Sequence, residues 1–117
     1  EAAGASFVAR GTVYHTRELD RLIELAMRKE GFALVEAVSY CHTTYGRMNR
    51  MGSAVDMMRR LKDDSITVER ARALAPEQVA GKIIRGVLVD RDIQEYTARY
   101  RGLLAKVQAG REEQRSV

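Results

Sequence analysis

The chain has 117 residues, of which 45% are hydrophobic and 31% are charged, and its mean hydropathy is -0.34. This composition is typical of one soluble globular domain and does not favour an intrinsically disordered chain. No apolar run approaches the roughly 20 residues that cross a bilayer, so we expect neither a membrane span nor a membrane partner. The net charge of +4 comes from Lys and Arg that alternate with Asp and Glu, as on an ordinary solvated surface.

Cys41 is the only cysteine, so the chain cannot form an internal disulfide. Together with His15 and His42 it provides at most three of the four ligands that a structural zinc site needs. The cysteine content therefore favours a cytoplasmic location, and the chain has no complete zinc site of its own.

The first part of the chain predicts a β-α-β unit. Residues 5–10 are rich in β-formers and are followed by Gly11, which we expect to begin a loop. Thr16 is the expected N-cap of a helix that ends near Gly31 and whose apolar face is formed by Leu19, Leu22, Ile23 and Ala26. Residues 32–38 are nearly all apolar, as in a strand covered on both faces. The helix between two strands favours a parallel pair in an α/β fold.

The segment of residues 39–52 has neither a strand period nor a helical period, and we predict a long functional loop there. Ser53 and Asp56 have the spacing of a capping box. They predict a helix that ends near Asp63, with Ala54, Met58 and Leu61 along one face.

Two short helices and one long helix are predicted in the remainder. We expect a helix over residues 67–74, a second one beginning at Pro76 with Val79, Ile83 and Ile84 as its buried stripe, and a brief extended segment at 86–89. Asp92 and Glu95 predict the cap of the long helix. Its stripe comprises Ile93, Tyr96, Tyr100, Leu103, Leu104 and Val107, and it should stop at Gly110. Residues 1–110 are thus expected to form one α/β domain, and 111–117 a frayed polar tail. Only two strands are evident, so the chain resembles the end of a larger sheet domain.

Cys41 lies three residues after the predicted strand of residues 32–38, and parallel sheets place ligand sites beyond the carboxyl ends of their strands. Three roles are open. Cys41 can be a packed residue at a strand end, a nucleophile paired with a histidine, or one thiolate of a metal or cluster site. His42 points away from Cys41 in an extended backbone, and His15 reaches it only if the fold brings the two together. We assign neither histidine to catalysis.

At this point a resemblance becomes specific. The chain resembles the beta subunit of 2-oxoacid:ferredoxin oxidoreductases, and most closely the 2-oxoglutarate branch. The residues that carry it lie at positions 4–10, 29–36, 39–49, 57–58, 86–89 and 95–96, with Tyr100 and the helix of Pro76. Because the family's Gly-Asp-Gly diphosphate motif and its Cys-x-x-Cys are both absent here, the resemblance is to the C-terminal part of such a subunit.

The resemblance implies a fold, a reaction and a site. The fold implied is the C-terminal portion of a parallel sheet domain of the type that binds thiamine diphosphate. The enzyme implied uses thiamine diphosphate with Mg²⁺ and a [4Fe-4S] cluster to decarboxylate a 2-oxoacid, form an acyl-CoA and reduce ferredoxin, together with alpha subunits. Cys41 matches the family's last cluster ligand in its Ser-x-Cys-x-Thr context, although Tyr40 stands where many relatives have Pro. Thr43 is expected to support the cluster or simply to cap the local turn, and the segment alone is expected to be inactive.

Two rival functions also follow from the sequence. A small basic nucleic-acid-binding module would use the stacking surfaces of Tyr40 and Tyr45 with Arg47, Arg50, Arg59, Arg60 and Lys62, but acidic residues interrupt this cluster. We therefore expect no nucleic-acid partner. The other rival is a subunit-interaction domain whose C-terminal helix packs on a partner.

Overall fold

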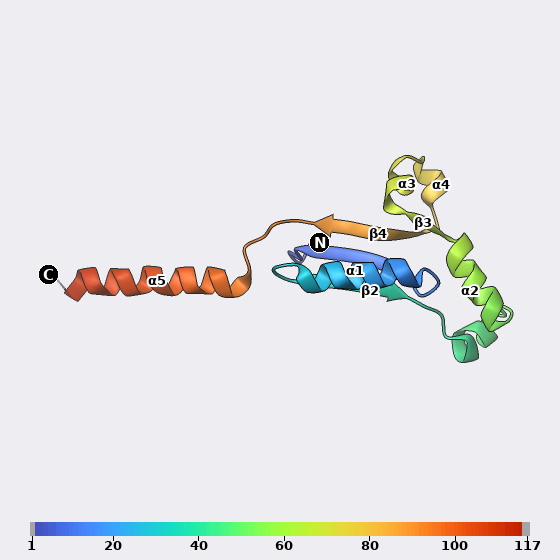
Figure 1. Cartoon of the computed structure of the whole chain (residues 1–117), viewed down its shortest axis with the longest axis horizontal. Helices are drawn as coiled ribbons and strands as arrows, with labels where there is room; N and C mark the ends of the chain where they lie inside the picture. Colours follow the sequence, from blue (N-terminus) through green and yellow to red (C-terminus); the bar gives the residue numbers. More distant parts are fainter. Residues whose placement is uncertain (1, 116–117) are drawn as a thin grey trace.

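The computed structural model describes residues 2–115. Figure 1 shows a sheet with helices around it and one long helix that extends away from it. The elements are β1 (Phe7–Thr12), α1 (Thr16–Arg28), β2 (Ala33–Val38), the π-helical turn η1 (His42–Gly46), α2 (Ala54–Asp63), β3 (Ser65–Thr67), α3 (Val68–Arg72), α4 (Pro76–Val79), β4 (Ile83–Asp90) and α5 (Tyr96–Arg115). The fold is of the α/β class, as predicted.

Four strands form one sheet in the order β2-β1-β4-β3. β1 and β2 run parallel from the pair Phe7 and Ala33 to the pair Thr12 and Val38, which confirms the predicted β-α-β unit. β4 runs antiparallel to β1, with Asp90 opposite Phe7, so the sheet is mixed rather than wholly parallel. β4 therefore ends beside the start of β1. The carboxyl ends of β1 and β2 lie together at the opposite end of the strands.

The main core lies between α1 and the sheet. Phe7, Ala9 and Leu22 are buried together there. Gly11 is a residue of β1 and not the start of a loop. Its missing Cβ leaves room for Leu19, whose Cδ1 would lie 2.9 Å from a Cβ at this position. The N-cap of α1 is His15 instead of Thr16, and Ile23 is 42% exposed, so the buried face is narrower than predicted.

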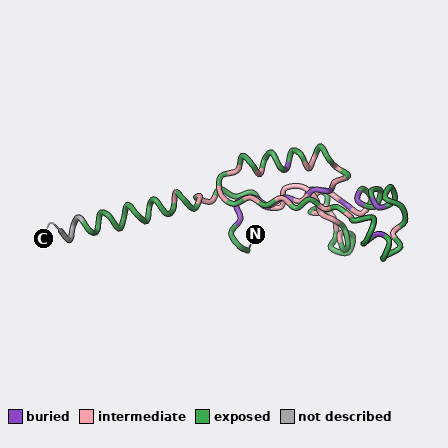
Figure 2. The backbone as a smooth tube through the Cα atoms, turned by 90° about the horizontal axis from the view of Figure 1, so that it is seen from below, coloured by how far each residue is buried: buried purple, intermediate pink, exposed green. Residues whose placement is uncertain are grey.

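β2 lies at one edge of the sheet and is not covered on both faces, contrary to the prediction. Ala33 and Val35 pack against the core, whereas Leu34 is 49% exposed and the preceding Phe32 is 64% exposed. Only one face of this apolar run is therefore covered by the described residues. Figure 2 shows the buried residues concentrated along the sheet and the neighbouring helices.

Two strands in the middle of the chain differ from the predictions. β3 was not predicted, and the first two residues of β4 were assigned to a helix. β3 pairs in parallel with the start of β4, so Ile83 and Ile84 belong to a strand and not to the stripe of the Pro76 helix. That helix, α4, begins at Pro76 as predicted. α3 also forms within the predicted range, with Thr67 as its N-cap.

α5 begins at Tyr96, and its predicted cap is only half correct. The Glu95 carboxylate accepts hydrogen bonds from the backbone N–H groups of Thr97 and Ala98 at 2.9 and 3.2 Å, whereas Asp92 and Ile93 lie before the helix. The helix continues past Gly110 to Arg115, and residues 116–117 of the predicted tail lie outside the described residues. Within residues 2–115, no helix is long and apolar enough to cross a membrane.

Candidate functional site

Cys41 lies just past the carboxyl end of β2, where the sequence places it. Between β2 and α2 the predicted loop is partly helical, because η1 spans His42–Gly46. The Gly46 N–H donates to the Cys41 carbonyl at 2.9 Å, and the Met51 N–H donates to the Gly46 carbonyl at 2.9 Å. These wide turns fix the backbone around Cys41. Five residues of π-helix are too few to produce a hydrophobic period, so no helix could be predicted here from the sequence.

The π-helical turn packs on α2 through Gly46. Gly46 is buried against the Met57 side chain, and a Cβ at this position would collide with the Met57 sulfur. α2 is itself fixed at its start by the predicted capping box, in which the Asp56 N–H donates to Ser53 Oγ at 3.2 Å and the Ser53 N–H donates to Asp56 Oδ2 at 2.9 Å. Its buried residues are Met57 and Leu61, while Met58 is 38% exposed, which corrects the predicted face.

The Cys41 thiol is exposed and surrounded by hydrogen-bond donors. Its Sγ lies 3.3 Å from Thr43 Oγ1. The Thr43 hydroxyl and then the backbone N–H groups of Thr44 and Tyr45 stabilise the thiolate, and they lower the pKa of Cys41 to about 6. Thr43 is thus placed beside the sulfur. Thr44 and Tyr45 also contribute here, and the sequence could show them only as neighbours in the chain, since backbone N–H groups carry no residue signature.

Two tyrosines brace this loop. The Tyr40 and Tyr45 rings stack with centroids 5.9 Å apart and an interplanar angle of 9°. The Tyr45 carbonyl also accepts a hydrogen bond from the Asn49 side chain at 2.8 Å. The two rings that the nucleic-acid alternative required as open stacking surfaces therefore stack on each other, and Arg59 from the same basic set lies 3.8 Å from the Asp56 carboxylate.

The histidines do not join this site. His15 Nδ1 lies 2.8 Å from Thr12 Oγ1, and the His15 ring stands edge-on to Tyr14 at 5.1 Å between centroids. Burial, followed by the charge of Arg85, lowers the pKa of His15. No hydrogen bond among the described residues connects either histidine with Cys41, so the structure contains no preformed Cys-His nucleophile pair.

The donor set fits one ligand of an iron–sulfur cluster. An Fe-S cluster is bound by Cys thiolates and tuned by hydrogen bonds to sulfur, and Cys41 provides an accessible thiolate with several donors around it. In the part of the chain that the structure describes, no group of three or more His, Cys, Asp or Glu side chains could hold a metal ion. Any cluster bound here would therefore take its other ligands from outside these residues.

The fold and the site together define an α/β sheet protein that presents a single stabilised thiolate beyond the end of a parallel strand. The 2-oxoglutarate synthase subunit KorB of Methanothermobacter marburgensis is 43% identical over 103 residues, which cover 88% of this chain and 36% of that protein. The subunit of the same name from Methanocaldococcus jannaschii is 38% identical over 108 residues, covering 92% of this chain and 40% of the relative.

A third relative carries the broader family name. The beta subunit of 2-oxoacid:ferredoxin oxidoreductase 2 from Aeropyrum pernix is 50% identical over 42 residues, or 36% of this chain and 14% of that subunit. The chain belongs to the beta subunits of 2-oxoacid:ferredoxin oxidoreductases and matches their C-terminal part. It spans less than half the length of the curated relatives. No protein-family profile matches the chain, and no solved structure matches it.

Proposed function

We propose that this chain is the C-terminal segment of a beta subunit of a 2-oxoglutarate, or related 2-oxoacid, ferredoxin oxidoreductase. The complete enzyme decarboxylates the 2-oxoacid, transfers the acyl group to coenzyme A and passes the electrons to ferredoxin. The relatives named 2-oxoglutarate synthase support the choice of substrate. The observation that carries the role of this segment is the Cys41 sulfur, which is exposed at the carboxyl edge of the sheet among the donors of residues 43–45.

In this proposal Cys41 is one of the thiolate ligands of a [4Fe-4S] cluster, and Thr43 hydrogen-bonds to its sulfur. Thiamine diphosphate with Mg²⁺ supplies carbanion stabilisation to the complete enzyme, and the cluster supplies one-electron transfer. The part of this chain is to hold Cys41 in position. Gly46, packed on Met57, fixes the turn, and the stacked Tyr40 and Tyr45 rings brace it. The residues that bind thiamine diphosphate belong to other parts of the subunit.

The partners in this proposal are the alpha and any further subunits of the oxidoreductase, with ferredoxin as electron acceptor and no nucleic acid or membrane. The name "subunit" of the relatives supports the assembly with other chains. We place the enzyme in the cytoplasm, because an exposed free thiol such as Cys41 persists best in a reducing compartment. The segment alone is inactive in this proposal, so thiamine diphosphate and Mg²⁺ added to the 117-residue chain should give no heat of binding. A saturable heat would contradict it.

The test of the cluster role uses the complete beta subunit with its partner subunits, purified without oxygen. Cys41→Ala removes the thiolate, and we expect iron per subunit and the EPR signal of the reduced cluster to fall while circular dichroism stays unchanged. Met48→Ala is the matched control, because Met48 lies on the same loop and is 78% exposed. Unchanged iron and an unchanged EPR signal in Cys41→Ala would show that Cys41 is not a ligand of the cluster.

A further inference from the structure

α5 (Tyr96–Arg115) extends away from the sheet, as Figures 1 and 2 both show. The chain measures 78 × 34 × 24 Å, and its radius of gyration is 21.6 Å. A compact domain of this length would have a radius of gyration of about 13 Å. In proteins, most of the stability of a helix comes from the packing of its apolar face against other elements. The length and isolation of α5 therefore indicate that another surface covers it in the assembled protein.

One side of α5 is apolar and exposed. Tyr96 is 75% exposed and Leu103 57% exposed, and Tyr100, Leu104 and Val107 are each between 42% and 50% exposed. Their spacing of three or four residues places them along one stripe of the helix. The Tyr96 and Tyr100 rings stack at 6.3 Å between centroids, so the stripe begins with a preformed aromatic surface. Such a stripe matches the anchors with which a helix binds an apolar groove.

The charged residues of α5 indicate which kind of partner surface the helix fits. From Tyr96 to Arg111 every ionisable group except the two tyrosines is a cation, namely Arg99, Arg101, Lys106 and Arg111. Two copies of α5 packed stripe to stripe would bring Arg99, Arg101 and Lys106 of one copy close to those of the other, and like charges across an interface are unfavourable. A groove bordered by Asp and Glu would instead be complementary to the helix.

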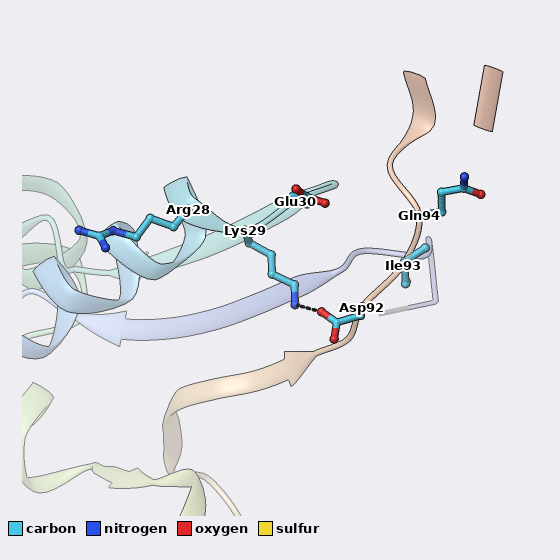
Figure 3. A pocket seen from close by; sticks show the side chains of 6 residues that line it. All are labelled: Arg28, Lys29, Glu30, Asp92, Ile93 and Gln94. Atoms are coloured by element: carbon cyan, nitrogen blue, oxygen red, sulfur yellow. Dashed lines mark hydrogen bonds and ion pairs between the residues drawn. The ribbon is translucent and has the colours of Figure 1, made fainter. Parts of the chain in front are cut away.

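The connection that leads from β4 to α5 is bound to the sheet and to the end of α1 at its first residues. Lys29 Nζ, at the end of α1, donates to Asp90 Oδ1 at 2.7 Å and to Asp92 Oδ1 at 2.8 Å, and Figure 3 shows the second of these contacts. The Arg91 N–H donates to the Ser6 carbonyl at 2.8 Å. The connection between β4 and α5 is thus held on both sides.

From these observations we propose that α5 is a docking helix, whose apolar stripe inserts into a groove bordered by carboxylates on another subunit of the oxidoreductase. The identity of the partner rests on the proposed function. The chemistry of the partner surface rests on the exposed stripe and on the cations between Arg99 and Arg111, which outnumber the two carboxylates of the helix, Glu112 and Glu113.

The first test compares two variants of the complete beta subunit that introduce the same carboxylate on opposite faces of α5. Leu103→Asp places it within the stripe, and Ala105→Asp places it on the other side of the helix. Binding to the other subunits is measured by sedimentation velocity over a series of concentrations. We expect Leu103→Asp to weaken binding by about tenfold or more, and Ala105→Asp to leave it within about twofold. Equal binding by the two variants overturns the proposal.

The second test addresses charge. The double variant Arg99→Glu with Lys106→Glu should weaken binding by about tenfold at low salt and reduce its salt dependence. Unchanged binding at low salt contradicts the acidic groove. Loss of self-association of the beta subunit alone in Leu103→Asp, with binding to the other subunits intact, would show that the occupant is a second copy. Flotation with phosphatidylglycerol vesicles that depends on Leu103, again with subunit binding intact, would show that it is a lipid surface. Both results overturn the proposal.

Iron content separates failure of this inference from failure of the proposed function. If the wild-type subunit holds its cluster and binds the other subunits, but Leu103→Asp changes nothing, only the docking role of α5 is wrong. If the wild-type subunit neither holds iron nor binds the other subunits, both proposals are wrong.

Discussion

The ionisation of Cys41 gives the most direct test of the site, and it can be measured on the 117-residue chain without any cofactor. The Thr43 hydroxyl is the largest cause that lowers the Cys41 pKa from its usual 9.0 to about 6, and the N–H groups of Thr44 and Tyr45 follow. A thiol with a pKa of about 6 is about 90% thiolate at pH 7, whereas one with a pKa of about 9 is only about 1% thiolate. The thiolate is therefore present above about pH 6 and is protonated below it.

Thr43→Val removes the hydroxyl while keeping the shape of the side chain. We expect the pKa of Cys41 to rise toward its ordinary value without reaching it, because the backbone N–H groups of residues 44 and 45 remain. The assay is the rate of iodoacetamide alkylation of the single cysteine as a function of pH, followed by mass spectrometry. The rate should reach half its maximum near pH 6 in the wild type and at a higher pH in the variant.

Thr43→Ser is the matched control, since it keeps a hydroxyl at the same position. Its alkylation profile should follow that of the wild type. The reasoning is refuted if Thr43→Val and the wild type titrate at the same pH, or if the wild-type cysteine titrates near pH 9. In either case the donors around the sulfur would not stabilise the thiolate.

Three further predictions concern the stability of the scaffold and are checked by urea unfolding of the same chain. Leu61→Ala should lower the free energy of unfolding by about 2–5 kcal/mol, because Leu61 is fully buried and the change leaves a cavity. Ser53→Ala should cost about 1 kcal/mol, since it removes the acceptor that caps α2, and no loss would show that Asp56 alone is sufficient. Gly31→Ala should cost about 1–3 kcal/mol, because Gly31 has φ of +95° and an added Cβ would meet the Ser6 hydroxyl. Gly102→Ala is its control, since nothing lies within 4 Å of that position and the free energy of unfolding should not fall.

Local signals in the sequence were sufficient for much of the fold. The parallel pair of β1 and β2, the capping box of Ser53 and the helix start at Pro76 were all predicted correctly, because each depends on residues close together in the chain. The position of Cys41 at the strand end followed from the same β-α-β unit. These features need no knowledge of distant partners.

Features that depend on distant contacts were not predicted. Ile83 and Ile84 were assigned to a helix, because a short apolar run has no period that separates a buried strand from a helix. Only their pairing with β3 decides between the two. The antiparallel direction of β4 has the same origin. At the site, the turn around Cys41 depends on Gly46 meeting Met57 of another helix. Of the donors to the sulfur, the Thr43 hydroxyl was predicted, whereas the backbone N–H groups of Thr44 and Tyr45 were not, because any residue type could provide them.

The antiparallel direction of β4 has a thermodynamic consequence. Cys41 follows the carboxyl ends of β1 and β2, whereas the chain leaves β4 toward α5 beside Phe7, at the other end of the same strands. A strand of six residues spans about 20 Å, which exceeds the distance at which mutational effects usually become additive. In a double-mutant cycle, the changes in the free energy of unfolding caused by Thr43→Val and by Leu103→Asp should therefore be additive, with a coupling energy below about 0.5 kcal/mol. The region around Cys41 and the helix α5 are therefore energetically independent, so a substitution in one should not change the effect of a substitution in the other.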